Sequence, residues 1–125
     1  MENGKKAILL IEDNPLLTGL YSAGFKKKGL EVFIVHNGEE GLKIIEEERP
    51  DIVLLDLFMP GMSGIEVLEK IRSNPKIKDT KVIVLTINNK EETKQKAKDL
   101  GVVDFLLKQE LHLNEIIEKV LSHLV

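Results

Sequence analysis

The sequence predicts an α/β protein in which a parallel β-sheet is covered by helices on both faces. Short apolar runs alternate five times with segments of helical periodicity, the pattern of parallel strands joined by right-handed crossovers. The run Ile52 to Leu55 is apolar throughout, as expected of a central strand buried on both faces. With 125 residues the chain is long enough for one domain with its own core. Residues 1–125 are therefore interpreted as a single domain, with its core at about 6–124.

The first strand is expected at Ala7 to Ile11, and a helix follows it. Asn14 is a good N-cap and Pro15 suits the first helical turn, while Gly29 is the kind of residue that ends a helix. The apolar stripe of this helix repeats at helical spacing. Its expected buried residues are Leu17, Leu20, Tyr21 and Phe25.

The later elements are predicted by the same rules. Further strands are expected at 32–35, 52–55, 81–85 and 102–107. Further helices are expected to begin at Asn37, at the capping box Ser63 to Glu66, near residue 89 and near Leu113. The helix from about 89 to 100 has only Ala97 and Leu100 as apolar anchors, so we expect it to be the most mobile helix.

Composition excludes several classes of function. The chain has no cysteine, so it has neither disulfides nor a thiolate metal site. The net charge is −3, and basic residues do not gather with aromatic ones, which argues against direct nucleic-acid binding. The longest apolar runs are too short to span a membrane and no signal peptide is recognisable, so we expect a cytoplasmic protein.

Polar residues follow four of the predicted strands. Because parallel strands all end at one edge of the sheet, that edge should collect Glu12, Asp13, Asp56, Thr86 and Lys108. Three carboxylates in one place repel one another unless a cation offsets them, and an all-oxygen set favours Mg²⁺, with Mn²⁺ as the alternative. A metal, an ammonium and a hydroxyl together suit phosphoryl transfer, with Asp56 as nucleophile and an acyl phosphate as product.

These residues also carry a resemblance to a known family. The motifs are Ile11 to Asn14, Asp56 to Gly64, Leu85-Thr86, and Gly101 through Phe105 to Lys108. Their order and spacing resemble the receiver domain of two-component response regulators, similar to chemotaxis regulators, over about Lys6 to Leu124. The resemblance implies a flavodoxin-like (βα)5 fold with a five-stranded parallel sheet in the order 2-1-3-4-5.

The resemblance also implies roles for single residues. Asp56 would accept a phosphoryl group from a sensor histidine kinase, a phosphotransfer protein or a small phosphodonor, with Thr86 and Lys108 assisting. Asp13, Asp56 and the Phe58 carbonyl would hold Mg²⁺, with Glu12 acting on the ion largely through water. Thr86 and Phe105 would act as the switch that changes the surface of the last two helices and the fifth strand. Such a chain is a phosphoacceptor switch or phosphorelay intermediate, not a turnover enzyme.

Two positions depart from the family pattern. Ile87 stands where a small residue is usual, and we expect it to crowd the site and slow both phosphorylation and hydrolysis. Gln109 stands where proline is usual, often after a cis peptide; a trans bond is expected here because a cis bond before a non-proline residue is costly.

Other functions remain as alternatives. A receiver-like interaction module that signals without phosphorylation is the first of them. An aspartyl-phosphate phosphatase would need two aspartates one residue apart after the first strand, which Glu12-Asp13-Asn14 lacks. A flavin domain is disfavoured because two acids would repel the flavin phosphate. The chain could stand alone or be the amino-terminal part of a larger regulator with an output domain, as a monomer or a phosphorylation-dependent dimer.

Overall fold

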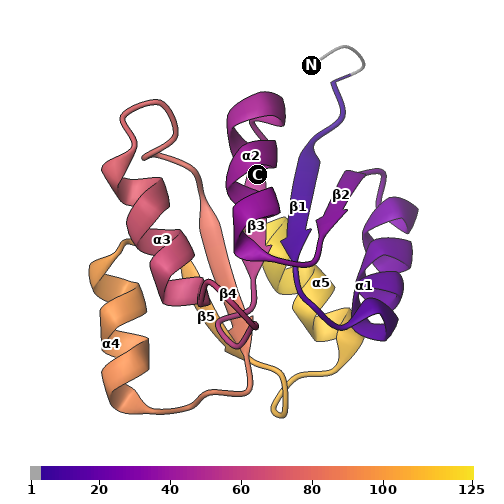
Figure 1. The fold of residues 1–125 in the computed structure, drawn as a ribbon. Helices are drawn as coiled ribbons and strands as arrows, with labels where there is room; N and C mark the ends of the chain where they lie inside the picture. The colour runs from indigo at the N-terminus through magenta and orange to yellow at the C-terminus, as the bar shows by residue number, and fades with distance from the viewer. Residues whose placement is uncertain (1–3) are drawn as a thin grey trace.

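The computed structural model describes residues 4–125, which form one parallel sheet between two layers of helices. The strands are β1 (Ala7–Ile11), β2 (Glu31–Val35), β3 (Ile52–Leu55), β4 (Val82–Thr86) and β5 (Asp104–Leu107). The helices are α1 (Pro15–Lys27), α2 (Gly38–Glu48), α3 (Gly64–Ser73), α4 (Glu91–Asp99) and α5 (Leu113–Ser122). The strand order is β2-β1-β3-β4-β5, and strand and helix alternate along the chain (Figure 1). The predicted fold class and strand order are confirmed.

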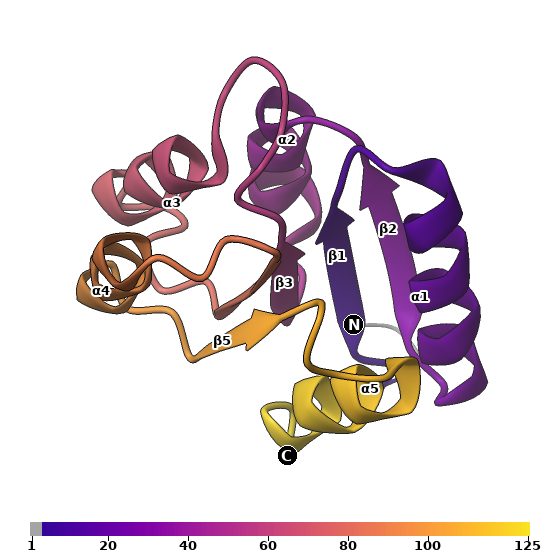
Figure 2. The ribbon, with the colours of Figure 1, turned by 90° about the horizontal axis from the view of Figure 1, so that it is seen from below.

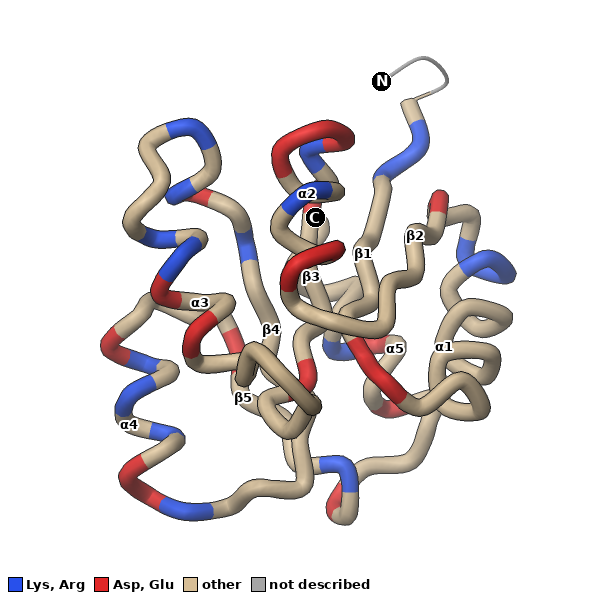
Figure 3. Tube along the Cα trace, viewed as in Figure 1, with Lys and Arg blue, Asp and Glu red and all other residues tan. Residues whose placement is uncertain are grey.

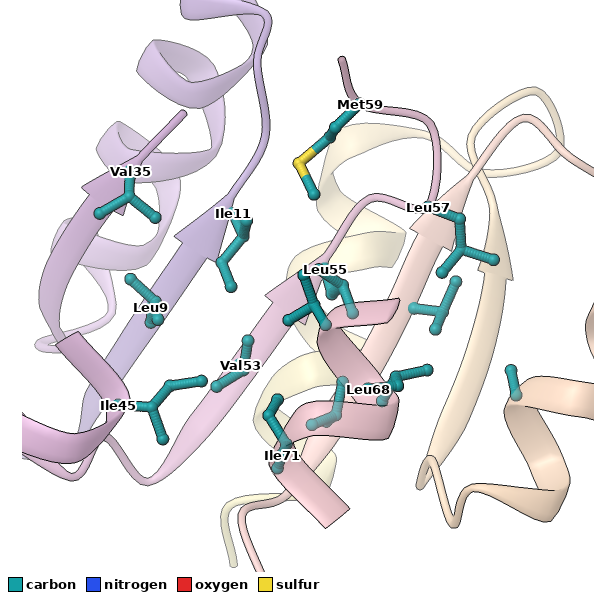
Figure 4. Packing of buried hydrophobic residues seen from close by; sticks show 14 of the residues in the cluster. Leu9, Ile11, Val35, Ile45, Val53, Leu55, Leu57, Met59, Leu68 and Ile71 are labelled. Carbon is teal, nitrogen blue, oxygen red and sulfur yellow. The ribbon is translucent and has the colours of Figure 1, made fainter. Parts of the chain in front are cut away.

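The helices divide between the two faces of the sheet (Figure 2). Helices α1 and α5 pack on one face, where Phe25 and Val120 belong to a common buried cluster. Helices α2, α3 and α4 pack on the other face. Figure 4 shows Ile45 of α2 and Leu68 and Ile71 of α3 lying close to side chains of the central strands, such as Val53. The central strands are therefore buried on both faces of the sheet, which explains the uniformly apolar β1 and β3.

The central strands β1 and β3 end side by side. Ile11 pairs with Leu55 in the parallel ladder, and the backbone N–H of Asp56 donates to the Ile11 carbonyl at 3.0 Å. The residue after each strand therefore leaves the sheet at the same edge. This register brings Glu12 and Asp56 together.

Helix α1 is rotated relative to the expected stripe. Leu20 is half exposed and Leu16 is largely exposed, whereas Thr18 and Ser22 are buried. The hydroxyl of Thr18 donates to the Pro15 carbonyl at 3.0 Å, so its burial leaves no unsatisfied polar group. The expectation that Leu20 is buried is wrong, because a satisfied threonine takes its place.

The strand and helix ends near α4 also differ from the expected bounds. The structure begins α4 at Glu91 and β5 at Asp104, later than the predicted residues 89 and 102. Val102 does not join the sheet because its N–H donates to the Ala97 carbonyl at 3.3 Å and closes the helix. The first bond to β4 comes from Val103, whose N–H donates to the Val82 carbonyl at 2.9 Å.

Arg72 at the end of α3 compensates for the weak apolar face of α4. Its guanidinium donates to the carbonyl oxygens of Leu100 and Gly101, which follow α4, and of Lys78 and Thr80, which precede β4. Burial lowers the pKa of this arginine from its usual value. One side chain thus ties the α3–β4 connection to the α4–β5 connection, at the edge opposite the acidic residues. Whether α4 is the most mobile helix stays a prediction.

Charged residues are mixed over the surface (Figure 3). Helix α4 carries acidic residues in its first turn and lysines in its last turn. No helix within residues 4–125 is long and apolar enough to cross a membrane.

Candidate functional site

Three carboxylates meet at the carboxyl edge of the sheet. Glu12 and Asp13 follow β1 and Asp56 follows β3, and one oxygen of each lies within 4.8 Å of the others. Glu12 and Asp56 are each only 5% exposed, while Asp13 faces solvent. The predicted acidic cluster is therefore formed, with two buried members and one that is open to water.

Local backbone contacts orient the buried carboxylates. One oxygen of Asp56 accepts a hydrogen bond from the N–H of Phe58 at 3.1 Å, and one oxygen of Glu12 accepts from the N–H of Asn14 at 3.2 Å. The chain turns sharply after each strand, because Asn14 caps α1 and the segment after Asp56 leads into α3. These turns aim N–H groups at the acids and partly offset their charge.

Gly64 fixes the path of the loop behind Asp56. Its N–H donates to the Leu57 carbonyl at 3.1 Å. A Cβ atom at this position would lie 2.6 Å from the Asp56 carbonyl oxygen and 2.6 Å from the Leu57 Cα. The first residue of α3 therefore has to be glycine for the backbone of the phosphoacceptor candidate to stay in place.

Lys108, from the end of β5, reaches across to both buried acids. Its Nζ lies 2.6 Å from Oε1 of Glu12 and 3.3 Å from Oδ2 of Asp56. The lysine side chain is itself largely buried, with 15% of it exposed. Lys108 is therefore a bridge between two carboxylates as well as a cation at the site.

The charges in this cluster shift one another's pKa values. Burial raises the pKa of Glu12, the hydrogen bond from Lys108 lowers it, and repulsion from Asp56 raises it, with a net upward shift. Burial alone would lower the pKa of Lys108, but the hydrogen bond to Glu12 and the charges of Asp56 and Glu12 outweigh it, and that pKa is raised. Lys108 is thus held as an ammonium ion, and the site favours an added positive charge.

Thr86 lies at the end of β4 and is fully buried. Its Oγ1 accepts a weak hydrogen bond from the N–H of Asn88 at 3.3 Å, so the hydroxyl is held by its own loop. Ile87, the next residue, is 56% exposed. All peptide bonds of the described chain are trans, including the one before Gln109, as expected.

The two predicted aromatic positions differ in their surroundings. Phe105 is half buried and packs against the core cluster on the side of α2, α3 and α4. The ring of Phe58 is 65% exposed, while its backbone N–H contacts Asp56. The carbonyl role of Phe58 and the switch role of Phe105 stay predictions.

Two residues near the site were not assigned to it from the sequence. Tyr21 of α1, expected only as a core residue, lines a small cavity of about 10 Å³ together with Glu12 and Asp56. His36 lies after β2, where its Nδ1 is 3.0 Å from the Glu12 carbonyl oxygen. The sequence did not indicate a place for Tyr21 at the site, because its spacing fits the apolar stripe of α1. Its position beside the acids depends on the rotation of that helix.

The donor set fits a hard divalent cation. Carboxylate oxygens are the preferred ligands of Mg²⁺ and Mn²⁺, and the cluster of Glu12, Asp13 and Asp56 offers no nitrogen or sulfur ligand. The exposed Asp13 leaves the cluster open to water, which suits Mg²⁺ because this ion keeps part of its hydration shell. The residues present therefore fit such an ion.

Comparison with known proteins agrees with this geometry. The family model of the response regulator receiver domain matches residues 8–121. Sporulation initiation phosphotransferase F of Bacillus subtilis (strain 168) is 33% identical over 117 residues, which cover 94% of this chain and 92% of the relative.

Solved structures give the same result. A response regulator receiver domain protein (CheY-like) from Methanospirillum hungatei JF-1 is 26% identical, with a TM-score of 0.89 and coverage of 97% of this chain and 94% of the other. The Mn²⁺-bound form of response regulator Rcp1 is 29% identical, with a TM-score of 0.80 and coverage of 94% and 90%.

Proposed function

Because the chain belongs to the family of response regulator receiver domains of two-component signal transduction, we propose that Asp56 is its phosphoacceptor. The observation that carries this proposal is the placement of Asp56: a buried carboxylate at the end of the central strand, beside two other acids and 3.3 Å from an ammonium group. The buried Glu12 is paired with Lys108 at 2.6 Å, whereas Asp56 has the longer contact. Asp56 is therefore the acid better placed to react.

In the proposed reaction a carboxylate oxygen of Asp56 attacks phosphorus. The bond from phosphorus to the donor's nitrogen or oxygen breaks, and the product is an acyl phosphate on Asp56. Glu12, Asp13, Asp56 and the Phe58 carbonyl would hold Mg²⁺, which when bound neutralises charge on the phosphoryl oxygens. Lys108 would turn from the carboxylates to a phosphoryl oxygen, since its ammonium already lies within reach of Asp56.

Thr86 and Phe105 are the proposed switch residues. The Thr86 hydroxyl oxygen accepts the 3.3 Å bond from the Asn88 N–H, and the hydroxyl can donate its own hydrogen to a phosphoryl oxygen in a stronger, charge-assisted bond. Movement of Thr86 would leave space for the ring of Phe105, which is half buried at the neighbouring strand. The surface of α4, β5 and α5 would then change for a downstream partner or output domain.

The phosphodonor is proposed to be a sensor histidine kinase or a phosphotransfer protein. The relative from Bacillus subtilis is named a phosphotransferase of sporulation initiation, which supports transfer of a phosphoryl group between proteins as the use of this fold. If phosphorylation changes the oligomeric state, the expected change is from a monomer to a dimer.

The test is incubation with Mg²⁺ and acetyl phosphate, followed by intact mass over time. We expect the gain of one phosphoryl group in the wild type and none in Asp56→Asn or without Mg²⁺. Asp51→Asn is the matched control, because it makes the same change at the opposite end of β3, where the carboxylate accepts from the Ala7 N–H at 2.7 Å. No gain, with this donor or a kinase, would favour a module that acts without phosphorylation.

A further inference from the structure

A side-chain hydrogen bond joins the loop between β4 and α4 to a distant part of the sequence. The side-chain Nε2 of Gln109 donates to the backbone carbonyl of Ile87 at 3.2 Å. This contact joins the loop that follows β4 to the loop that follows β5 (Figure 1). Its two residues stand directly after Thr86 and Lys108, which are both proposed to contact the phosphoryl group.

The other hydrogen bonds of this loop are short-range in sequence. The N–H of Asn88 donates to Thr86 Oγ1 at 3.3 Å and the N–H of Lys90 donates to Asn88 Oδ1 at 3.0 Å, both within the loop. Among residues 4–125, no other side-chain hydrogen bond connects residues 87–90 to an element other than β4, whose last residue is Thr86.

Helix α4 adds little restraint to its own loop. Its N-cap residue, Lys90, makes no side-chain cap hydrogen bond, and Ala97 is the one residue of the helix that is buried. The strong polar anchor of this region, Arg72, acts beyond the far end of α4. The amino-terminal end of α4 therefore offers the loop few polar or apolar contacts that would restrain it.

We propose that Gln109 is a positioning residue, a latch that holds the Thr86–Ile87 loop in the arrangement seen here. The proposal rests on the proposed function, in which the Thr86 hydroxyl moves to a phosphoryl oxygen and the loop that follows it shifts. The bond from Gln109 to Ile87 opposes that shift. Proline at this position would have no donor, so the latch exists because the side chain is an amide.

The latch also adds to the effect of Ile87. The Ile87 side chain is 56% exposed, and it is carried by a backbone whose carbonyl is the acceptor of the latch. Gln109 therefore restrains the backbone that follows Thr86 and carries the Ile87 side chain. Loss of the latch should raise the fraction of molecules whose loop is free to rearrange.

Amide exchange measured by NMR without phosphodonor tests the latch itself. In Gln109→Met, which keeps the size and removes the donor, the amides of Asn88 and Lys90 should exchange about two- to tenfold faster, the range for losing one exposed hydrogen bond. Gln109→Lys keeps a donor of similar reach and should restore slow exchange. Gln95→Met is the matched control, because it removes an amide that bonds Asp99 at 2.9 Å within α4 and should leave these amides unchanged.

Phosphorylation by acetyl phosphate tests the positioning role. The rate of phosphoryl gain should be higher in Gln109→Met than in the wild type, by at most the factor by which amide exchange is faster. Gln109→Lys should gain the phosphoryl group at the wild-type rate. Unchanged exchange in Gln109→Met overturns the latch, whether or not the wild type is phosphorylated. Faster exchange with an unchanged or slower phosphoryl gain overturns the positioning role, and failure of the wild type to react tells against the proposed function only.

Discussion

The ammonium of Lys108 lies 2.6 Å from a carboxylate oxygen of Glu12, a residue 96 positions earlier in the chain. This contact is shorter than the one from Lys108 to Asp56, at 3.3 Å. The Lys108–Glu12 pair spans the carboxyl edge of the sheet from β5 to β1, past the ends of β3 and β4. Lys108 therefore supports the fold as well as the chemistry of the site.

Replacing Lys108 by methionine should destabilise the protein. The change leaves the buried Glu12 and Asp56 carboxylates without their cation, and we expect a loss of about 2 to 3 kcal/mol of unfolding free energy in urea at neutral pH. Lys28→Met is the matched control. It breaks the Lys28–Glu118 pair, whose side chains are 48% and 65% exposed, and should cost less than about 1 kcal/mol. Equal losses in the two variants would contradict a supporting role for Lys108.

The acidic cluster could be predicted from the sequence because it depends on topology alone. Once the strands are parallel, Glu12 and Asp56 must leave the sheet at one edge, and the structure has them there. The contact from Lys108 to Glu12 could not be predicted. It depends on the tilt of β5 and on side-chain reach across the sheet, which apolar patterns do not encode.

The differences in the fold have a similar origin. The stripe of α1 was predicted from hydrophobicity, yet the buried face includes Thr18, whose hydroxyl is satisfied inside the helix, and leaves Leu20 exposed. The role of Arg72 was also missed, because its partners are backbone carbonyls, which leave no mark on the sequence. Apolar periodicity predicts which elements exist, whereas polar contacts with the backbone set their rotation and ends.

Gly64→Ala should destabilise the protein by about 2 kcal/mol, since a Cβ would press on the backbone of Asp56 and Leu57. The same variant should lose phosphoryl gain, because the backbone of Asp56 must shift. Gly19→Ala is the matched control in the interior of α1, where a Cβ meets nothing within 4 Å. It should stabilise by about 0.5 to 1 kcal/mol. Denaturant unfolding of both variants checks the pair, and a neutral Gly64→Ala would show that the loop can relax.

Asp13→Asn should stabilise the metal-free protein. It removes one of three like charges within 4.8 Å, and the exposed position limits the gain to about 1 kcal/mol. Mg²⁺ should raise the melting temperature of the wild type and have less effect on this variant, since a carboxylate ligand is lost. Glu47→Gln, an exposed acid on α2, serves as the control and should keep the wild-type response. The same Mg²⁺ response in Asp13→Asn would remove Asp13 from the set of ligands.

Tyr21 offers a pH titration that reports on the site directly. It is the one tyrosine of the chain, which has no tryptophan, so tyrosinate absorbance belongs to this residue alone. Burial raises the pKa of its hydroxyl above the usual 10.0; Lys108 opposes the shift and the charges of Glu12 and Asp56 add to it. Asp56→Asn should therefore lower the midpoint relative to the wild type, and Lys108→Met should raise it.

The sign of the accompanying change in stability follows from the same shift. Because the pKa of Tyr21 is higher in the folded than in the unfolded protein, its contribution to stability is complete below pH 10 and is lost as the pH rises through the folded value. Circular dichroism recorded alongside absorbance separates ionisation in the folded state from alkaline unfolding. Asp51→Asn, at the far end of β3, should leave the midpoint unchanged. If the wild-type midpoint lies at the ordinary tyrosine value and does not change in Asp56→Asn, the ionisation of Tyr21 does not depend on the acidic cluster.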